Sequence, residues 1–355
     1  MDDPPPPSTL YPKITTHIPE IIKTLQWRTR DPDRPDEETH LDPIPITGSV
    51  KLHGTHADIL ISPPPTSTIT LQSRNTTNLV PSADNFDFAS TMSSKRDILL
   101  HLRDQFLDRW RTLNPEAELD TSIPVTIAGE WIGPGIQKGV AIANLSRRFV
   151  IISAKVNGSW VNDKSYADIE APASAIYNIS RGGFYHSILY PSTPQTTITE
   201  LEALAEKVAS HCPFAASFGI IGPGEGLVWK LDPYISDASL WFKTKGGRFK
   251  PTFVPPPKKL PASMEEKRMA AVKVAQAWCG EERLEQGWAY LREKGIKRGM
   301  RGIGEFLKWV QMDILVEEKG YIREHAVDEV MLRQAIIGVA KPWFLARVAD
   351  GTELD

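Results

Sequence analysis

Lys51 stands at the end of a run rich in β-branched residues and just before a glycine-tightened turn, in the order Lys51-Leu52-His53-Gly54. A lysine side chain has a reference pKa of about 10.4, so almost none of it is a free amine at neutral pH. Burial and neighbouring cations lower that pKa and expose the nitrogen lone pair. Lys51 is therefore a candidate nucleophile, although a Lys-x-x-Gly pattern alone is more often a surface lysine.

Two groups of cationic residues are candidates for binding anions. Lys243 and Lys245 lie two residues apart in a predicted strand, so their side chains point to the same face. Two ammonium groups on one face repel each other unless an anion lies between them, which suits a phosphate. Arg74 ends another predicted strand with a guanidinium that can grip oxygens in a bidentate manner. The alternative is that the two lysines protect an edge strand from aggregation.

Two carboxylates stand at comparable places in the sequence. Glu225 precedes Gly226 at the start of a predicted strand, and Glu130 leads into a Gly-Pro-Gly turn at residues 133–135. Mg²⁺ binds few protein carboxylates, because it keeps several waters and takes oxygens from substrate phosphates, so one glutamate is enough. Each glutamate could instead be a solvated charge at a strand end. Together, the nucleophile, carboxylates and cations fall at the starts and ends of strands in one domain.

The elements that must position these residues follow from the hydrophobic pattern. Short β-branched runs predict strands, fourfold apolar spacing predicts helices, and a proline-rich stretch predicts an extended linker. Strands are expected at 46–62, 67–73, 123–131, 148–156, 226–231 and 239–245, and helices at 95–113, 199–210, 263–278, 281–294, 302–318 and 325–347. The predicted class is α+β followed by a small helical domain.

The predicted domain organisation has four parts. They are a disordered proline-rich tail at 1–15, a catalytic domain at 16–250, a linker at 251–262 and a helical domain at 263–350.

Composition narrows the classes of function. The 355 residues carry a formal net charge of −3, so contact with nucleic acid must come from a local patch. Cys212 and Cys279 have no partner pattern, which argues against a disulfide framework and against a cysteine zinc site. No apolar run is long enough to span a membrane, and the acidic N-terminus lacks the apolar segment of a secretory signal. We expect an intracellular monomer, cytoplasmic or nuclear, with no membrane partner.

The order of these residues resembles the motifs of the covalent nucleotidyltransferases, which comprise DNA ligases, RNA ligases and mRNA-capping guanylyltransferases. The matching segments are Lys51–Thr55, Arg74, Gly129-Glu130, Glu225-Gly226 and Lys243-x-Lys245. His53 sits where most members carry an aspartate, and in this it is similar to the bacteriophage RNA ligase 2 family, which seals nicks in double-stranded RNA. Residues 129–138, 310–315 and 341–343 resemble that family too, so the likeness runs from about residue 20 to 348.

The resemblance implies a catalytic domain of twisted, mainly antiparallel sheets with flanking helices. It also implies an ATP-dependent RNA ligase, which forms lysyl-AMP, transfers AMP to an RNA 5′-phosphate and joins that end to a 3′-hydroxyl, as in a nicked duplex. The implied roles are nucleophile for Lys51, nucleophile loop for His53 and Gly54, nucleotide and 5′-phosphate contact for Arg74, ribose contact for Glu130, Mg²⁺ or Mn²⁺ ligand for Glu225, and phosphate contacts for Lys243 and Lys245.

Two points leave alternatives open. Where the family stacks an aromatic side chain on adenine and follows it with an aspartate, this chain has Ile152 and Ser153. Ile152 is a nucleotide-binding candidate that would replace stacking by an aliphatic wall. Phe149 is a second candidate that could stack instead, although alternation in a strand places it on the opposite face from Ile152. A capping-type enzyme that uses GTP, or a catalytically silent nucleic-acid-binding module, therefore remains an alternative. A basic run containing Lys297, Arg298 and Arg301 is either a solvated loop or a contact to the RNA backbone.

Overall fold

The computed structural model describes residues 10–30, 39–250, 261 and 263–351. The chain divides into two compact units, Met1–Phe249 and Lys250–Asp355. Residues 1–9 of the predicted tail, and 251–260 and 262 of the predicted linker, lie outside the described residues. The rest of the predicted tail is ordered, because Tyr11 and Ile14 are buried. The expectation of a disordered segment reaching residue 15 is therefore wrong for residues 10–15.

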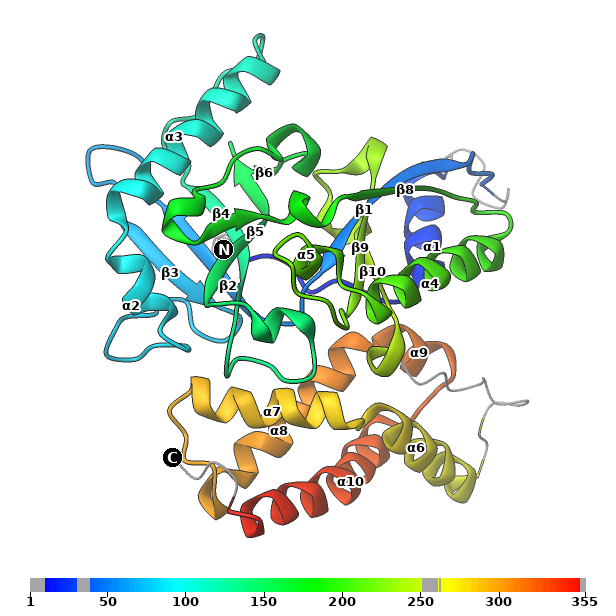
Figure 1. Ribbon diagram of the computed structural model, residues 1–355. Helices are drawn as coiled ribbons and strands as arrows, with labels where there is room; N and C mark the ends of the chain where they lie inside the picture. The colour runs from blue at the N-terminus through cyan, green and yellow to red at the C-terminus, as the bar shows by residue number, and fades with distance from the viewer. Residues whose placement is uncertain (1–9, 31–38, 251–260, 262, 352–355) are drawn as a thin grey trace, which may run out of the picture. The chain divides into compact units, whose positions relative to one another are not determined.

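The first unit contains two sheets of mainly antiparallel strands (Figure 1). The four-stranded sheet has the order β10-β9-β1-β8, and the six-stranded sheet has the order β3-β2-β4-β5-β6 with β7 paired to β5 in parallel. The strands are β1 Ile44–Lys51, β2 Thr55–Ile61, β3 Ile69–Ser73, β4 Val125–Ile132, β5 Arg148–Val156, β6 Ser159–Trp160, β7 Ile176–Asn178, β8 Phe184–Leu189, β9 Gly226–Leu231 and β10 Phe242–Lys245. The mainly antiparallel α+β class is confirmed.

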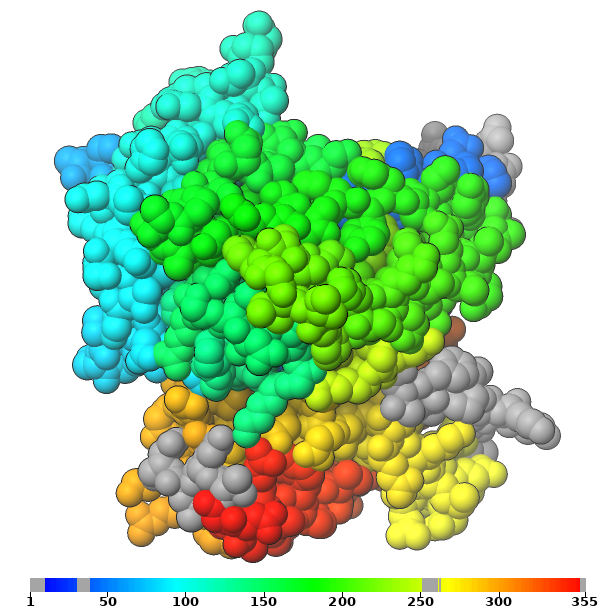
Figure 2. Space-filling model, viewed as in Figure 1, coloured from blue at the N-terminus to red at the C-terminus, as the bar shows by residue number. Residues whose placement is uncertain are grey.

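Helices flank both sheets. Those of the first unit are α1 Ile18–Thr29, α2 Phe88–Ser93, α3 Arg96–Leu113, α4 Pro194–Ser210 and α5 Pro213–Ala216. Residues of α1, α4 and α5 pack into one apolar core with the four-stranded sheet, and residues of α2 and α3 pack into a second core with the six-stranded sheet. In the space-filling view, green segments from later in the chain lie across the middle of the first unit on the side shown (Figure 2). Strand β1 is an inner strand of its sheet, paired with β9 on one side and with β8 on the other.

Alternation along β1 decides which side chains face the helix-covered core and which lie on the opposite face with Lys51. Ile46 and Val50 point into the helix-covered core, so Thr47, Ser49 and Lys51 lie on the other face. That second face meets a small cluster in which residues of both sheets pack together, including Ala128 of β4 and, partly buried, Val228 of β9. Lys51 therefore emerges on the side of its sheet that is turned toward the other sheet.

Several elements differ from the predicted pattern. The predicted strand 46–62 is two strands, because Leu52–Gly54 form a turn between β1 and β2. Helix α1 is not among the predicted elements, although its buried residues recur at helical spacing and its proline stands in the first turn, where helices tolerate it. Strand β8 has few buried positions, so its sequence carries little apolar alternation.

The second unit is helical throughout its described residues, as predicted. Its helices are α6 Met264–Trp278, α7 Glu281–Glu293, α8 Ile303–Glu317, α9 Lys319–Glu324 and α10 Glu329–Ala349. Trp288, Phe306 and Phe344 are buried in its core, and Ser263 with Glu266 forms a capping box that starts α6. In the part of the chain that the structure describes, no helix combines the length and the apolar character needed to cross a membrane.

We predict that Gly48→Ala destabilises the first unit. Gly48 lies opposite Trp229 in the β1–β9 register, and a Cβ atom at Gly48 would come 2.7 Å from the indole ring. Overpacking of this kind costs about 1–3 kcal/mol, which lowers Tm by about 2–4 °C per kcal/mol in a unit of this size. Thermal unfolding followed by circular dichroism measures it. The matched control is Gly304→Ala in α8, which meets open space and should be neutral or slightly stabilising.

Candidate active site

The strand register brings the candidate nucleophile and one candidate phosphate-binding lysine to the same carboxylate. Lys51 at the end of β1 lies opposite Gly226, and Gly226 lies opposite Lys245 at the end of β10. Glu225 directly precedes Gly226, so it enters the sheet between the two lysines. A Cβ atom at Gly226 would come 2.1 Å from the carbonyl oxygen of Thr244. The glycine after Glu225 is therefore what allows β9 and β10 to pair at this point.

The Glu225 carboxylate is paired on both of its oxygens. Oε2 lies 2.7 Å from Nζ of Lys51, and Oε1 lies 3.0 Å from Nζ of Lys245. The side chain of Glu225 is only 1% exposed, whereas that of Lys51 is 24% exposed. Burial alone would raise the pKa of Glu225, but the charges of Lys51 and Lys245 hold that pKa well below its usual value. Glu225 is thus held as a carboxylate between two ammonium groups that are themselves partly exposed, Lys51 at 24% and Lys245 at 18%.

The turn after Lys51 contacts both candidate carboxylates. His53 is buried, its ring lies 4.7 Å from that of Phe249, and its Nδ1 is 3.6 Å from Oε2 of Glu225. The backbone N–H of Gly54 donates a hydrogen bond of 3.0 Å to Oε1 of Glu130. The structure therefore brings His53 and Gly54, which follow the candidate nucleophile, into contact with the two candidate carboxylates.

Glu130 is the second buried carboxylate of the site. Burial raises the pKa of Glu130, and the nearby charges of Lys51 and His56 and the Gly54 hydrogen bond offset that only in part. The pKa values of the two glutamates are therefore shifted in opposite directions. Glu225 is stabilised as a carboxylate by cations, whereas Glu130 forms no ion pair with another described residue and its burial disfavours the charged form.

Lys243 shares the face of Lys245 but is more buried, with 8% of its surface exposed. Its backbone N–H donates to the carbonyl oxygen of Thr15, 2.8 Å away. Arg74, just beyond the end of β3, donates a 2.6 Å hydrogen bond from Nη1 to the carbonyl oxygen of Tyr11. Thr15 and Tyr11 were not predicted as partners, because both belong to the N-terminal segment that was expected to be disordered.

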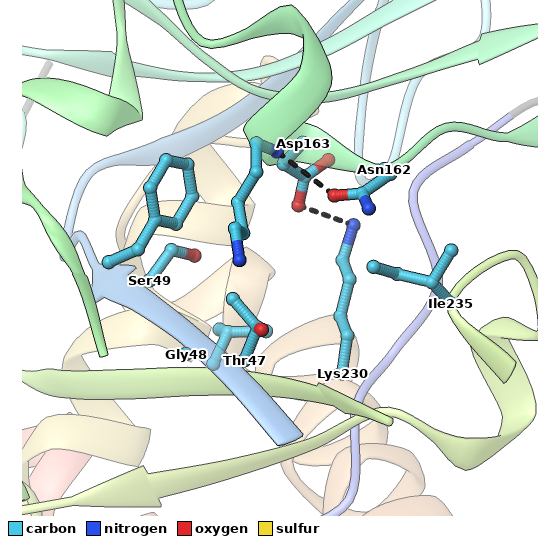
Figure 3. Close-up of a pocket in the computed structure, with 10 residues that line it drawn as sticks. Thr47, Gly48, Ser49, Asn162, Asp163, Lys230 and Ile235 are labelled. Carbon is cyan, nitrogen blue, oxygen red and sulfur yellow. Dashed lines mark hydrogen bonds and ion pairs between the residues drawn. The ribbon is translucent and has the colours of Figure 1, made fainter. Parts of the chain in front are cut away.

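A second buried charge pair lies on the same face of the four-stranded sheet. Lys230 of β9 lies 2.7 Å from Asp163 and 3.0 Å from Oγ of Ser153, and its ammonium is 3.8 Å from the centre of the Trp241 ring. Ser153 donates in turn to Oδ1 of Asp163 at 2.7 Å. Figure 3 shows Lys230 and Asp163 pointing toward each other at a small pocket that is also lined by Thr47 and Ser49 of β1. Asp163 thus supplies a carboxylate beside the serine that stands where the resemblance expects an aspartate.

The residues near the predicted base contact are divided between two faces of β5. Ile152 is partly buried and packs into the cluster between the sheets. Phe149 is fully buried on the other face, with its ring 5.8 Å from that of Phe88 in α2. This corrects the inclusion of Phe149 among nucleotide-binding candidates, since its ring is enclosed in the core beneath α2 and α3.

The basic run of the second unit contains both exposed and buried side chains. Lys297 and Arg301 are exposed, but Arg298 is 4% exposed and its guanidinium lies 5.6 Å from the centre of the Trp288 ring. Arg298 is therefore a packed residue of the helical core, which corrects its inclusion among candidate RNA contacts.

The site suits a divalent cation that takes few protein ligands. Within the described ranges, no group of three or more His, Cys, Asp or Glu side chains could hold a metal ion. Mg²⁺ needs only one or two carboxylates when water and phosphate oxygens complete its shell. Glu225 fits that requirement once one of its ammonium partners gives way, because both of its oxygens carry one.

Comparison with known proteins finds no matching family model and no matching curated protein. Among solved structures, this chain is similar to the RNA ligase of Naegleria gruberi. The structure with pyrophosphate has 13% identity and a TM-score of 0.42, and a lysine-to-methionine variant with AMP and Mn has 14% identity and a TM-score of 0.41. Each match covers 68% of this chain and 57% of the ligase. This chain thus spans less than two thirds of that ligase, and so distant a likeness assigns no activity to it.

We predict opposite stability effects for neutralising the two glutamates. Glu225→Gln leaves two ammonium groups without their buried anion and should cost about 3–5 kcal/mol at pH 7. Glu130→Gln keeps an acceptor for Gly54 and removes a disfavoured charge, so it should stabilise by about 1.4 kcal/mol for each unit of raised pKa. Urea unfolding at several pH values measures both, with exposed Glu116→Gln as a control that should change little.

The pH dependence follows from the direction of each shift. The lowered pKa of Glu225 stabilises the fold above its unfolded value of about 4.3, and this contribution disappears as the pH falls through the folded pKa. The raised pKa of Glu130 destabilises the fold increasingly as the pH rises from about 4.3 to the folded pKa. The differences in free energy of unfolding between the unchanged protein and each of the two Gln variants should therefore be largest near neutral pH and shrink in acid. If both variants changed the free energy of unfolding in the same direction at pH 7, the opposite pKa shifts assigned to Glu225 and Glu130 would be contradicted.

Proposed function

We propose that this chain is an ATP-dependent RNA ligase that seals 3′-hydroxyl and 5′-phosphate ends through a lysyl-AMP intermediate. The observation that carries the proposal is the placement of Lys51, 2.7 Å from buried Glu225, with Lys245 on the other oxygen of the same carboxylate. Phosphoryl transfer mainly requires positioning and the neutralisation of developing charge. The site supplies a partly exposed amine for attack and cations on one strand face for phosphate oxygens.

In the first proposed step, Nζ of Lys51 attacks the α-phosphorus of ATP. A P–N bond forms, the bond from the α-phosphorus to the bridging oxygen breaks, and pyrophosphate leaves. The amine must first lose a proton, and Glu225 is a poor acceptor because its pKa lies well below the usual range. Since the side chain of Lys51 is 24% exposed, that proton goes to water.

In the later steps, the Lys51 nitrogen no longer carries a positive charge. The phosphoramidate nitrogen of lysyl-AMP carries no positive charge, so Lys51 no longer pairs with Glu225 as an ammonium. A divalent cation bound at Glu225 and at phosphate oxygens would supply positive charge beside the reacting phosphates. The RNA 5′-phosphate oxygen then displaces Lys51 from the AMP phosphorus, and the 3′-hydroxyl finally displaces AMP to form the phosphodiester. Lys243, Lys245 and Arg74 are the proposed phosphate contacts through these steps.

Two alternatives are less well supported. A capping-type enzyme would carry an OB-fold after residue 250, whereas the described residues of the second unit form helices α6 to α10. A catalytically silent binding module would have no need to keep a carboxylate that is 1% exposed between two ammonium groups. Because Ile152 replaces the aromatic contact, the choice of ATP over GTP is the point that the test must decide.

We predict that the full chain with Mg²⁺ or Mn²⁺ becomes labelled by α-³²P-ATP through an acid-labile bond. Lys51→Ala should abolish the label, whereas Lys207→Ala, which removes an exposed lysine of α4, should leave it unchanged. Denaturing gels with autoradiography measure this. Label from GTP alone would favour the capping-type enzyme, and no label from either nucleotide would favour the binding module.

The labelled protein then reports on the substrate. We expect transfer of AMP from the isolated adenylylated protein to a 5′-phosphorylated nick in duplex RNA, followed by sealing. A duplex with a 5′-hydroxyl at the nick is the matched control, because it lacks the attacking phosphate. Retention of the label on the protein with both substrates would contradict an RNA ligase.

A further inference from the structure

The segment Leu10–Thr15, which we call the N-terminal strap, connects the two sheets of the first unit. At one end, Tyr11 accepts a hydrogen bond of 2.6 Å from Arg74, beyond β3, and its N–H donates one of 3.0 Å to Asp58 in β2. At the other end, Thr15 accepts a 2.8 Å hydrogen bond from the backbone N–H of Lys243 and forms a parallel bridge with Phe242. The strap therefore runs from the six-stranded sheet to the edge of the four-stranded sheet.

The side chain of Tyr11 fastens the strap between the sheets. It is 6% exposed, and its ring lies 5.5 Å from that of Trp160, 5.4 Å from that of Trp241 and 6.1 Å from that of His56. The charges that act on its hydroxyl come from Asp163, Arg74, Glu130 and Asp58. Glu130 is in turn affected by the charge of Lys51. The charge of Glu130, the proposed ribose contact, is thus one of those that act on the Tyr11 hydroxyl.

The type of partner that holds Arg74 matters for function. A carboxylate would fix a guanidinium but also neutralise its charge, whereas a backbone carbonyl orients it and leaves the full charge in place. A guanidinium has five N–H donors, so one bond to Tyr11 leaves others for a ligand. Holding a long side chain in one conformation also removes entropy that would otherwise be lost when an anion binds.

Asp58 also holds the strap backbone at Tyr11. It is 0% exposed, and its Oδ2 accepts hydrogen bonds from the Tyr11 N–H at 3.0 Å and is 2.9 Å from Nε2 of His56. A buried carboxylate that orders the strap backbone fixes the direction of the Tyr11 carbonyl, and through it the direction of Arg74.

We propose that the N-terminal strap is part of the active site, with Tyr11 as a positioning residue that holds Arg74 ready to bind a nucleotide or RNA phosphate. The inference rests on the proposed ligase function and extends it, since it makes phosphate binding by Arg74 dependent on a segment that lies far away in the sequence. It predicts that losing the strap weakens nucleotide binding mainly through Arg74.

The test is a double-mutant cycle on formation of lysyl-AMP at a series of ATP concentrations. We compare the full chain, a deletion of residues 2–15, Arg74→Ala, and the two changes combined. The deletion and Arg74→Ala should each raise KM for ATP about tenfold, and the combination should raise it no more than about twofold beyond either alone. A product of the two separate effects, near a hundredfold, would overturn the inference.

Two controls separate positioning from loss of stability. Leu99→Ala removes a buried side chain of α3, outside the strap, so it should lower Tm without raising KM. Deletion of residues 2–9 keeps the strap and should leave KM unchanged. If the larger deletion fails to fold, Tyr11→Ala takes its place in the cycle with the same expected non-additivity. Absence of lysyl-AMP in the full chain would contradict the proposed function, whereas additive effects in a labelled protein would contradict only the strap.

Discussion

The arrangement of the first unit depends on one buried carboxylate. Glu225 is withdrawn from water, which is unfavourable for an ion unless cations compensate it. Lys51 and Lys245 provide that compensation from two different strands, on the two sides of the strand that Glu225 begins. The interaction therefore requires the order β10-β9-β1 and its register, since a shift of β1 or β10 by one residue would turn the lysine of that strand to the other face.

The same constraint explains how one site can hold two carboxylates of different character. Glu225 lies on the four-stranded sheet among ammonium groups, and Glu130 lies on the six-stranded sheet against a backbone N–H. A carboxyl group outside an ion pair suits contact with sugar hydroxyls, because its oxygens can accept hydrogen bonds from them. A fixed anion suits an ammonium or a metal ion. The two environments divide these tasks without any change of residue type.

The sequence predicted the residues that lie at strand ends better than their partners. Lys51, Glu225 and Lys245 could be found because each sits next to a glycine or in an alternating strand, which are local signals. Their contact spans 174 residues between Lys51 and Glu225, and only the resemblance to known motifs linked them beforehand. Tyr11 and Asp163 were not found, because their contacts to Arg74 and Lys230 join segments that share no periodic pattern. Phe149 and Ile152 were placed on opposite faces by simple alternation, which holds here although the β4–β5 register shifts between Ala128 and Gly129.

The site draws its residues from two sheets, so its geometry depends on contacts that join them. Lys51 and Glu225 come from one sheet, whereas Glu130 and Arg74 come from the other. Two polar links hold the sheets together near these residues: Lys230 with Asp163 and Ser153, and the strap from Arg74 to Lys243. The first link keeps a carboxylate beside Ser153 even though the strand itself carries none, because Asp163 reaches it from a short 3₁₀ helix. The contacts of Lys230 with Asp163 and Ser153 therefore fix the separation of the two sheets at this point.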